Sequence, residues 1–319
     1  MPSTTTTSTS FFRKMLERAK TREAMEAILL VLAAVAFNMV FGYFSMIFAF
    51  ILSFFEWDYL SPLEFVGLEN YVKILRDLSK GFSGVYWLQS PFFTGLRNIL
   101  IYTAFVVPTQ TILAIVLGTL ANQKLKGTTF YKLVYFLPGT TSAVIISLLF
   151  IWLFRKQGFI NWVFQNVAPG FAPDWLNEPN YVIPAMALVA IWGTSGHFTV
   201  SFLAALQSIP PDLYEAAALD GAGRFKRFWY ITLPMLKPMT IYVLIMGIIG
   251  TLQMFDLAFV LGGSTGGGPG GMGYTVTMDI YKEAFVKLRV GLAAAKSFAL
   301  FTMVFGFTYI IRKRYEVIR

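Results

Sequence analysis

The chain has 319 residues, of which 56% are hydrophobic and 13% are charged. Ordinary soluble domains carry about 25% charged residues, so this composition excludes that class and indicates a membrane protein. The sequence contains no cysteine, which excludes disulfide bonds and thiolate metal sites. The formal net charge of +9 comes from basic residues scattered between apolar segments, a distribution that fits membrane topology better than a nucleic-acid-binding face.

Six apolar segments predict the fold. Residues 27–55 carry no charge and form a run too long for a cleaved signal peptide, so they predict a retained transmembrane helix. Five further segments of about 22–25 residues exceed the roughly 20 residues that a bilayer core requires. They are 99–121, 133–154, 182–206, 239–261 and 290–311. The expected fold is therefore all-α, a polytopic membrane protein with a six-helix domain over 27–311 and tails over 1–26 and 312–319.

Lysine and arginine residues predict the orientation. If the N-terminus is cytoplasmic, sixteen of these residues fall in inside segments and eight in outside segments, with Arg97 and Lys296 at or inside spans. Positive residues favour the cytoplasmic side, so both termini and the connection between spans four and five are expected there. The family resemblance given below implies that this membrane is a bacterial cytoplasmic (inner) membrane.

That connection, 208–238, is a polar and basic interruption between two apolar spans. Glu215 to Leu219 consists mostly of strong helix formers, and Gly221 can turn the chain by adopting positive φ. A second helical run begins at Arg224 and is expected to stop at Pro234. The pattern predicts two helices joined by a glycine elbow at the cytoplasmic face. An amphipathic helix lying in the membrane interface is the alternative.

No pattern in the sequence indicates an enzyme. The glycine-rich segment 262–273 lacks the Lys-Ser or Lys-Thr of a phosphate-binding loop, so a flexible outer loop is expected. His197 is the single histidine, and no span carries paired carboxylates. The chain is therefore expected to have no catalytic residues and no metal site, and any ATP hydrolysis must belong to another subunit.

Nine residues of the 208–238 connection, in their order and spacing, resemble the EAA loop of binding-protein-dependent ABC importer permeases. These residues are Glu215, Ala216, Ala217, Asp220, Gly221, Ala222, Ile231, Leu233 and Pro234. In that family the loop docks onto the ATPase subunit. The segments FVGLENY, RNILIYTAFVVP, FDLAFVLGG and IYKEAF resemble the sugar-uptake branch, in particular its MalF-like and UgpA-like subunits.

The resemblance implies a transport subunit that moves a sugar or oligosaccharide by alternating access. It implies a second permease subunit, two ATP-binding cassette ATPases and an external substrate-binding protein as partners. It also implies no cofactor in this chain, because ATP and Mg²⁺ would bind to the ATPase. Glycerol phosphate or another polar solute is an alternative substrate. An ion-driven secondary transporter is an alternative class, for which inverted repeats would be expected.

Polar residues within spans are costly unless they face a cavity or a partner, which makes several of them candidates for a substrate path. The wider set is Asn38, Gln110, Ser195, His197, Gln253 and Asp256. The resemblance places a sugar site between the helices that flank the EAA loop. It selects Thr194, His197, Thr251 and Met254, with Thr141 and Ser142 as further candidates. Trp192 could stack on a sugar, and helix packing is the alternative role for each of these residues.

Asp256 and Lys296 are predicted to lie at matching depth below the outer ends of spans five and six, about 8–9 Å at 1.5 Å per residue. An unpaired charge in a span costs about 2.5–3.5 kcal/mol on the insertion scale. We therefore expect either that the two charges pair or that each side chain extends to the outer interface.

Overall fold

The computed structural model describes residues 23, 25–84, 87–123, 127–263 and 267–316. Most of the expected N-terminal tail, 1–26, lies outside these residues, as do residues 317–319 of the C-terminal tail. The structure is helical apart from one small hairpin among the described residues, in which Phe55 pairs with Phe65. The elements in chain order are η1 (Met39–Phe44), α2 (Ser45–Leu52), β1 (Phe55–Glu56), β2 (Glu64–Phe65), α3 (Glu69–Phe82), η2 (Trp87–Gln89), α4 (Pro91–Ala121), α5 (Thr128–Gly139), α6 (Ala143–Leu153), α7 (Phe159–Val167), α8 (Pro179–Gln207), α9 (Pro211–Leu219), α10 (Arg224–Arg227), η3 (Phe228–Thr232), α11 (Leu233–Met235), α12 (Lys237–Leu252), α13 (Asp256–Leu261), η4 (Pro269–Gly271), α14 (Val276–Tyr281), η5 (Lys282–Val286) and α15 (Val290–Glu316).

Four helices of the described chain are long and apolar enough to cross a membrane: Met25–Leu52, Pro91–Ala121, Pro179–Gln207 and Val290–Tyr315. Two further pairs of helices meet this test when each pair is taken together. Leu133–Gly139 and Ala143–Leu153 meet at a bend of 108°, and Arg224–Met235 and Lys237–Leu252 meet at 62°. The described chain therefore has four candidate spans, or six if each bent pair counts as one. The first pair matches the expected span 133–154, whereas the second covers 224–252 and not the expected 239–261.

The third expected span, 133–154, is broken at its centre. Pro138 lies near the end of α5, and the hydroxyls of Thr140 and Thr141 both donate to the carbonyl of Leu137. Ser142 then takes an extended conformation with ψ of 135° before α6 begins. Proline and threonine thus end the first half-helix locally. The number of apolar residues in 133–154 alone predicts one continuous helix.

The fifth expected span, 239–261, is also interrupted. α12 ends at Leu252, and α13 begins at Asp256 after a break of three residues. Thr277, the second residue of α14, donates its hydroxyl to the carbonyl of Met254 within the break. A side chain from a distant segment therefore satisfies backbone that the helix leaves open.

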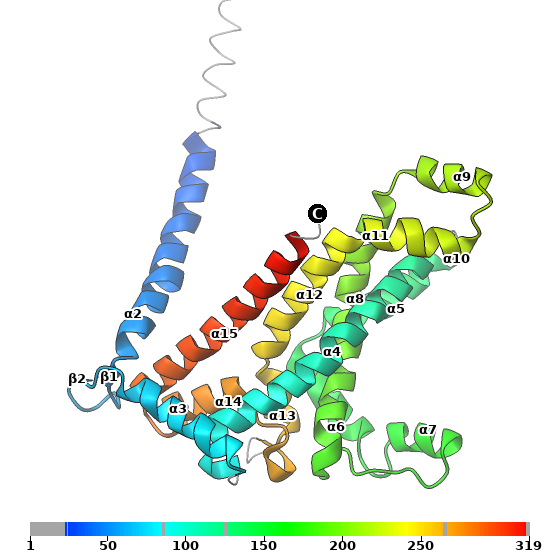
Figure 1. Ribbon diagram of the computed structural model, residues 1–319. Helices are drawn as coiled ribbons and strands as arrows, with labels where there is room; N and C mark the ends of the chain where they lie inside the picture. The colour runs from blue at the N-terminus through cyan, green and yellow to red at the C-terminus, as the bar shows by residue number, and fades with distance from the viewer. Residues whose placement is uncertain (1–22, 24, 85–86, 124–126, 264–266, 317–319) are drawn as a thin grey trace, which may run out of the picture.

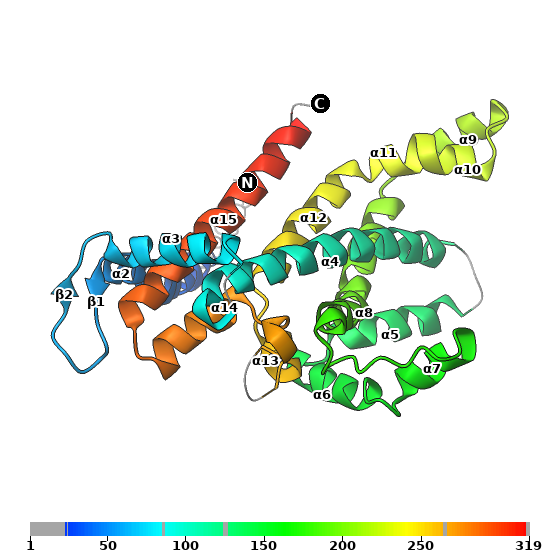
Figure 2. The same ribbon diagram turned by 60° about the horizontal axis from the view of Figure 1, so that its bottom comes forward.

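The core of the bundle is the crossing of α4 and α8, which pack along much of their length. Gly118 on α4 allows close approach, because a Cβ built there would lie 3.2 Å from Cβ of Phe202 on α8. Small residues at such crossings let helix backbones come together in a membrane. α12 packs against α4 and also contacts α8, and α13 packs against α6 (Figure 2).

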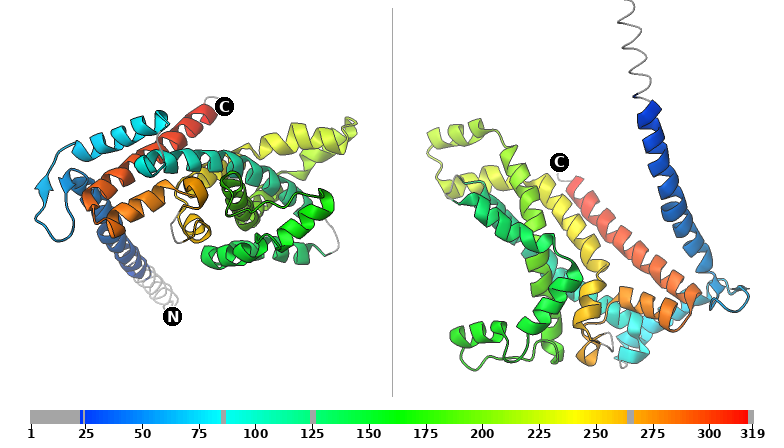
Figure 3. Two further views of the ribbon diagram at one scale, coloured as in Figure 1. Left: turned by 90° about the horizontal axis from the view of Figure 1, so that it is seen from below. Right: turned by 180° about the vertical axis from the view of Figure 1, so that it is seen from behind.

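The first helix, Met25–Leu52, leans away from the bundle for most of its length (Figure 3). Its apolar window is not buried against the rest of the chain. The start of this helix, the end of α15 and the α9–α10 connection lie at the same end of the molecule, at the top of Figure 1. α3, α7 and α13 lie at the opposite end.

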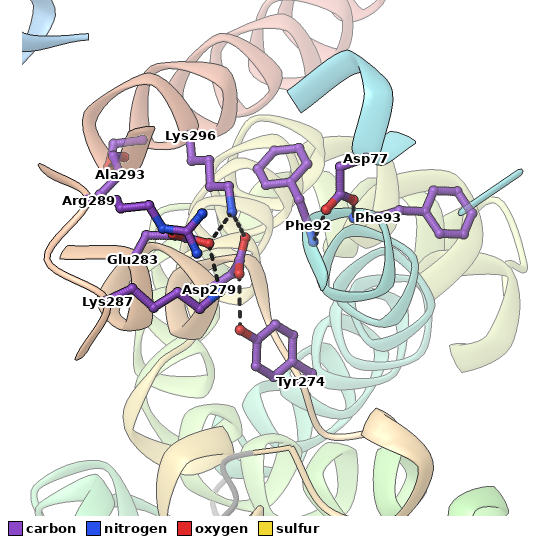
Figure 4. Close-up of polar contacts among 11 residues, drawn as sticks. Asp77, Phe92, Phe93, Tyr274, Asp279, Glu283, Lys287, Arg289, Ala293 and Lys296 are labelled. Atoms are coloured by element: carbon purple, nitrogen blue, oxygen red, sulfur yellow. Dashed lines mark hydrogen bonds and ion pairs between the residues drawn. The ribbon is translucent and has the colours of Figure 1, made fainter. Parts of the chain in front are cut away.

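Asp77 on α3 fixes the start of α4 at that opposite end. Its carboxylate accepts the backbone N–H of Phe93 at 2.9 Å and that of Phe92 at 3.4 Å (Figure 4). Burial raises the pKa of Asp77 above its ordinary value, although both N–H groups act to lower it. The carboxylate satisfies donors that the first turn of any helix leaves without a partner.

Candidate functional site

A cavity of about 440 Å³ lies between α4, α8, α12 and the two helix breaks. This volume is typical of sites for small molecules, about 300–1,000 Å³. Its walls are mainly apolar, with a few polar groups that converge on the space. The polar side chains are those of Tyr102, Gln110, Thr141, Thr194, Thr251, Gln253 and Asp256.

Gln110 lies at the junction of α4, α8 and α12 and is 1% exposed. The hydroxyl of Thr194 on α8 donates to Oε1 of Gln110 at 2.7 Å. Nε2 of Gln110 has no hydrogen-bond partner among the described residues. It faces Gly247 on α12, where a built Cβ would lie only 2.5 Å away. The glycine therefore provides the room that the buried amide needs.

Thr251 connects α12 to α4 across the cavity wall. The hydroxyls of Thr251 and Thr103 lie 3.0 Å apart, and that of Thr251 also reaches the carbonyl of Gly247 at 2.8 Å. The first contact joins two helices, and the second lies within α12. Thr251 accordingly helps to shape the wall in addition to lining the space.

The structure brings some of the expected substrate-path residues together and not others. Thr141, Thr194, Thr251, Gln253 and Met254 all line the cavity. Gln110 and Asp256, which belonged to the wider polar set, line it as well. The resemblance alone did not select these two.

Trp192, Ser142 and His197 are not among the cavity residues. Trp192 lines a second, mostly apolar cavity of about 600 Å³ between α4, α5 and α8, where its ring packs edge-on against Phe150. His197 is exposed on α8 beside Phe198. Asn38 donates its amide to Ala34 on the first helix and is exposed there.

Lys296 forms a buried cluster of ions with two carboxylates, but neither is Asp256. Its Nζ lies 2.6 Å from Oδ2 of Asp279 and 3.0 Å from Oε1 of Glu283 (Figure 4). The expected Asp256–Lys296 pair is therefore wrong. The depth estimate assumed a continuous helix through Asp256, whereas the break at 253–255 places this residue at the cavity instead.

Further partners complete the cluster. Lys287 and Arg289 reach Glu283 at 3.0 and 3.1 Å, and the hydroxyl of Tyr274 donates to Asp279 at 3.0 Å (Figure 4). Burial opposes ionisation of Glu283, but the charges of Lys296 and Lys287 outweigh it and lower the pKa of Glu283. The cluster fastens α14 and η5 to α15. Asp279 and Glu283 are four residues apart in the sequence, but this spacing alone does not indicate that Lys296 is their partner.

The expected two-helix elbow is present between α9 and α10. Gly221 has φ of +76°, a conformation that favours glycine. Ala222 donates its N–H to the carbonyl of Ala217 at 2.8 Å, which closes the end of α9. The hydroxyls of Tyr214 and Thr232, 2.9 Å apart, connect the two arms.

The second arm of the elbow is longer than the sequence predicts. Its helix continues through Pro234 to Met235, with a π-helical stretch over η3. This wider turn ends two residues before Pro234, whose missing N–H would otherwise interrupt an α-helix. Apolar side chains at the elbow are open to solvent: Leu219 is 90% exposed and Phe225 is 76% exposed.

Comparisons with known proteins agree with this architecture. Residues 100–315 match the family described as binding-protein-dependent transport system inner membrane component. The trehalose/maltose transport system permease protein MalF of Thermococcus litoralis is 32% identical over 304 residues, 94% of this chain and 96% of that protein. The sulfoquinovosyl glycerol transport system permease protein SmoG of Agrobacterium fabrum is 34% identical over 76% of this chain and 74% of that protein.

Among solved structures, a bacterial ABC transporter that imports the acidic polysaccharide alginate contains a similar chain. It has a TM-score of 0.72 and 21% sequence identity, and the match covers 94% of this chain and 99% of that one. This likeness confirms the expected fold of an importer transmembrane domain. The family match and the relatives confirm the resemblance inferred from the EAA loop and the segments around it. The chain therefore belongs to the family of binding-protein-dependent transport system inner membrane components, as a multi-pass membrane protein.

Proposed function

We propose that this chain is one of two permease subunits of an ATP-driven importer that moves a sugar or oligosaccharide across the membrane by alternating access. One observation carries the proposal. The second arm of the elbow runs at a 62° bend directly into α12, and α12 forms a wall of the cavity through Met246, Gly247, Gly250 and Thr251. A displacement of the elbow therefore moves the wall of the cavity.

The exposed elbow is the proposed docking site for an ATPase subunit. Ala216 and Ala217 let a partner surface approach closely, Glu215 offers it a charge, and Gly221 sets the bend. Ile231, Leu233 and Pro234 lie along the second arm, where the partner's movement would enter the bundle. ATP and Mg²⁺ would bind to the ATPase and not to this chain. Lysine and arginine counts, and the common end shared with the elbow in Figure 1, support cytoplasmic termini.

The other partners would be a second permease subunit, a second copy of the ATPase and an external substrate-binding protein. The cavity is open on the side away from α4, because Thr141, Thr194, Gln253 and Asp256 are exposed in the single chain. A second permease would close that side. The mixture of hydroxyl, amide and carboxylate groups with apolar walls suits a polyhydroxylated solute, which supports the sugar assignment.

Reconstitution tests the proposal. The chain should purify with an ATPase subunit, and the complex in liposomes should hydrolyse ATP faster when its binding protein and a sugar such as trehalose or maltose are added. Gly221→Pro should release the ATPase while the chain stays folded, because proline cannot adopt the positive φ of Gly221. Transport by the purified chain alone on an ion gradient would contradict the proposal.

A further inference from the structure

Asp256 gives the cavity a negative wall. It is the one charged side chain among the described residues that line the cavity. It is the first residue of α13, directly after the break that ends α12. Its side chain is exposed and makes no ion pair with another described residue.

Lys296, the cation that the sequence suggested as a partner for Asp256, is engaged elsewhere. It is 4% exposed and is held between Asp279 and Glu283. Lys296 is therefore paired with these two carboxylates and not with Asp256. Asp256 consequently keeps its charge available to whatever enters the cavity.

We propose that Asp256 selects against anionic solutes, so that the solute of this importer is an uncharged polyhydroxylated molecule. The proposal rests on the proposed function and narrows its substrate class. The proposal separates the neutral solutes named for similar proteins from the acidic ones. Trehalose and maltose are neutral, whereas sulfoquinovosyl glycerol carries a sulfonate and alginate is acidic.

The chemistry of the wall supports this choice. An ionised carboxylate is an acceptor with two oxygens, so it can accept hydrogen bonds from two neighbouring hydroxyls of a sugar. An anion offers it no donor and is repelled, and the repulsion is strong in a partly desolvated space. Recognition of phosphate or sulfonate normally requires Arg or Lys, and no such residue lines the described cavity.

The local electrostatic potential can be measured without knowing the solute, because the chain contains no cysteine. Gly250 lines the cavity, and a Cβ built on it meets nothing within 4 Å. Gly250→Cys therefore places one thiol in the cavity of the assembled complex. Its rate of modification is measured with a methanethiosulfonate that carries trimethylammonium and with one that carries sulfonate. The unsubstituted chain gives the background from the other subunits.

We expect the cationic reagent to be favoured at Gly250→Cys, and Asp256→Asn to reduce the ratio of cationic to anionic rates by about tenfold, the factor that corresponds to 1.4 kcal/mol. Asp256→Glu should keep the ratio. As a matched control, Ser83→Cys, at an exposed position directly after α3 and at the end of the molecule opposite the elbow, should show the same ratio with and without Asp256→Asn.

An unchanged ratio at Gly250→Cys would overturn the proposal, because a partner side chain would then neutralise Asp256. Failure of both reagents and of an uncharged methanethiosulfonate to reach thiols at Gly250 and at Thr141 would also overturn it, since Asp256 would not then face an aqueous solute. Neither outcome bears on whether the complex transports sugars.

A second measurement addresses the solute itself. ATP hydrolysis by the reconstituted complex is followed with maltose, trehalose and sn-glycerol 3-phosphate, using the same binding protein for the wild type and for Asp256→Asn so that its own preference cancels. The substitution should raise the response to the anion relative to the sugars. Stimulation of the wild type by the anion alone would overturn the proposal while leaving the importer assignment intact. No stimulation by any solute would instead count against the proposed function.

Discussion

Gly247 on α12 and Gln110 on α4 touch without room for another atom: a Cβ built on the glycine would lie 2.5 Å from Nε2 of the amide. The contact joins the helix that continues from the elbow to the central helix of the bundle. It lies in the cavity wall, next to the hydrogen bond between Gln110 and Thr194.

Gly247→Ala should therefore push α12 away from α4. Overpacking of this kind costs about 1–3 kcal/mol, and we expect a lower thermal unfolding midpoint of the purified complex. Gln110→Ala added to Gly247→Ala should restore much of the loss, since it removes the atom that collides. Gly250→Ala, three residues along the same helix with open space at its Cβ, is the control. Equal effects of the two alanine substitutions would refute this explanation.

Lys296→Met should be strongly destabilising, because it leaves Asp279 and Glu283 buried without their cation. Removal of one partner from a buried pair costs about 3–5 kcal/mol. Expression and thermal unfolding measure the effect. Addition of Asp279→Asn and Glu283→Gln should recover part of it.

The control for Lys296 is Lys73→Met. Lys73 pairs with Glu56 at 3.3 Å, but the two side chains are 35% and 58% exposed. A pair of this kind contributes about 0–1 kcal/mol, so the substitution should change the midpoint little. A similar loss of thermal stability in both variants would show that the effect of Lys296→Met does not come from burial of its ion cluster.

Glu283 should make stability depend on pH on the acidic side. Its pKa in the folded chain is below the ordinary value of 4.5. The stabilisation from its charge is complete above the unfolded-state pKa and is lost as the pH falls through the lower folded-state pKa. Glu283→Gln should lower the midpoint at pH 7 but flatten its decline below about pH 4.5. The exposed Glu64 on β2, changed to Gln, should leave the curve unaltered. A decline as steep in Glu283→Gln as in the wild type would rule out this assignment.

Phe225→Ala should weaken retention of the ATPase subunit without destabilising the chain, because this ring is 76% exposed at the elbow. Pull-down of the ATPase and the thermal midpoint are measured on the same preparations. Phe159 on α7, 60% exposed at the opposite end of the molecule, supplies the control. If Phe159→Ala weakens retention equally, the elbow is not the docking surface.

The sequence predicted the features that depend on local patterns. Apolar run length located five of the six expected spans, and Gly221 between two helix-forming runs located the elbow, because both signals act within a few residues. The breaks at 140–142 and 253–255 were missed. The first depends on threonine hydroxyls that bond back to Leu137, and the second on Thr277 donating from a segment far along the chain.

The cavity was partly predictable for a similar reason. Thr194, Thr251 and Met254 came from the resemblance, and polarity within a span flagged Gln110 and Asp256. The partner of Lys296 could not be chosen without the fold. Asp279 and Glu283 lie outside the apolar spans, and only the packing of α14 and η5 against α15 brings them to the lysine.

The two broken helices have a consequence for water. Thr141, Gln253 and Asp256 lie at the two breaks with exposed polar side chains that line the cavity, and such groups are tolerated at membrane depth only where protein or water satisfies them. The resting cavity should therefore be hydrated. A sugar that enters exchanges its own hydration shell for hydroxyl, amide and carboxylate groups that were already bonded to water, so the exchange of hydrogen bonds is nearly even. A site of this kind can release its cargo as readily as it accepts it.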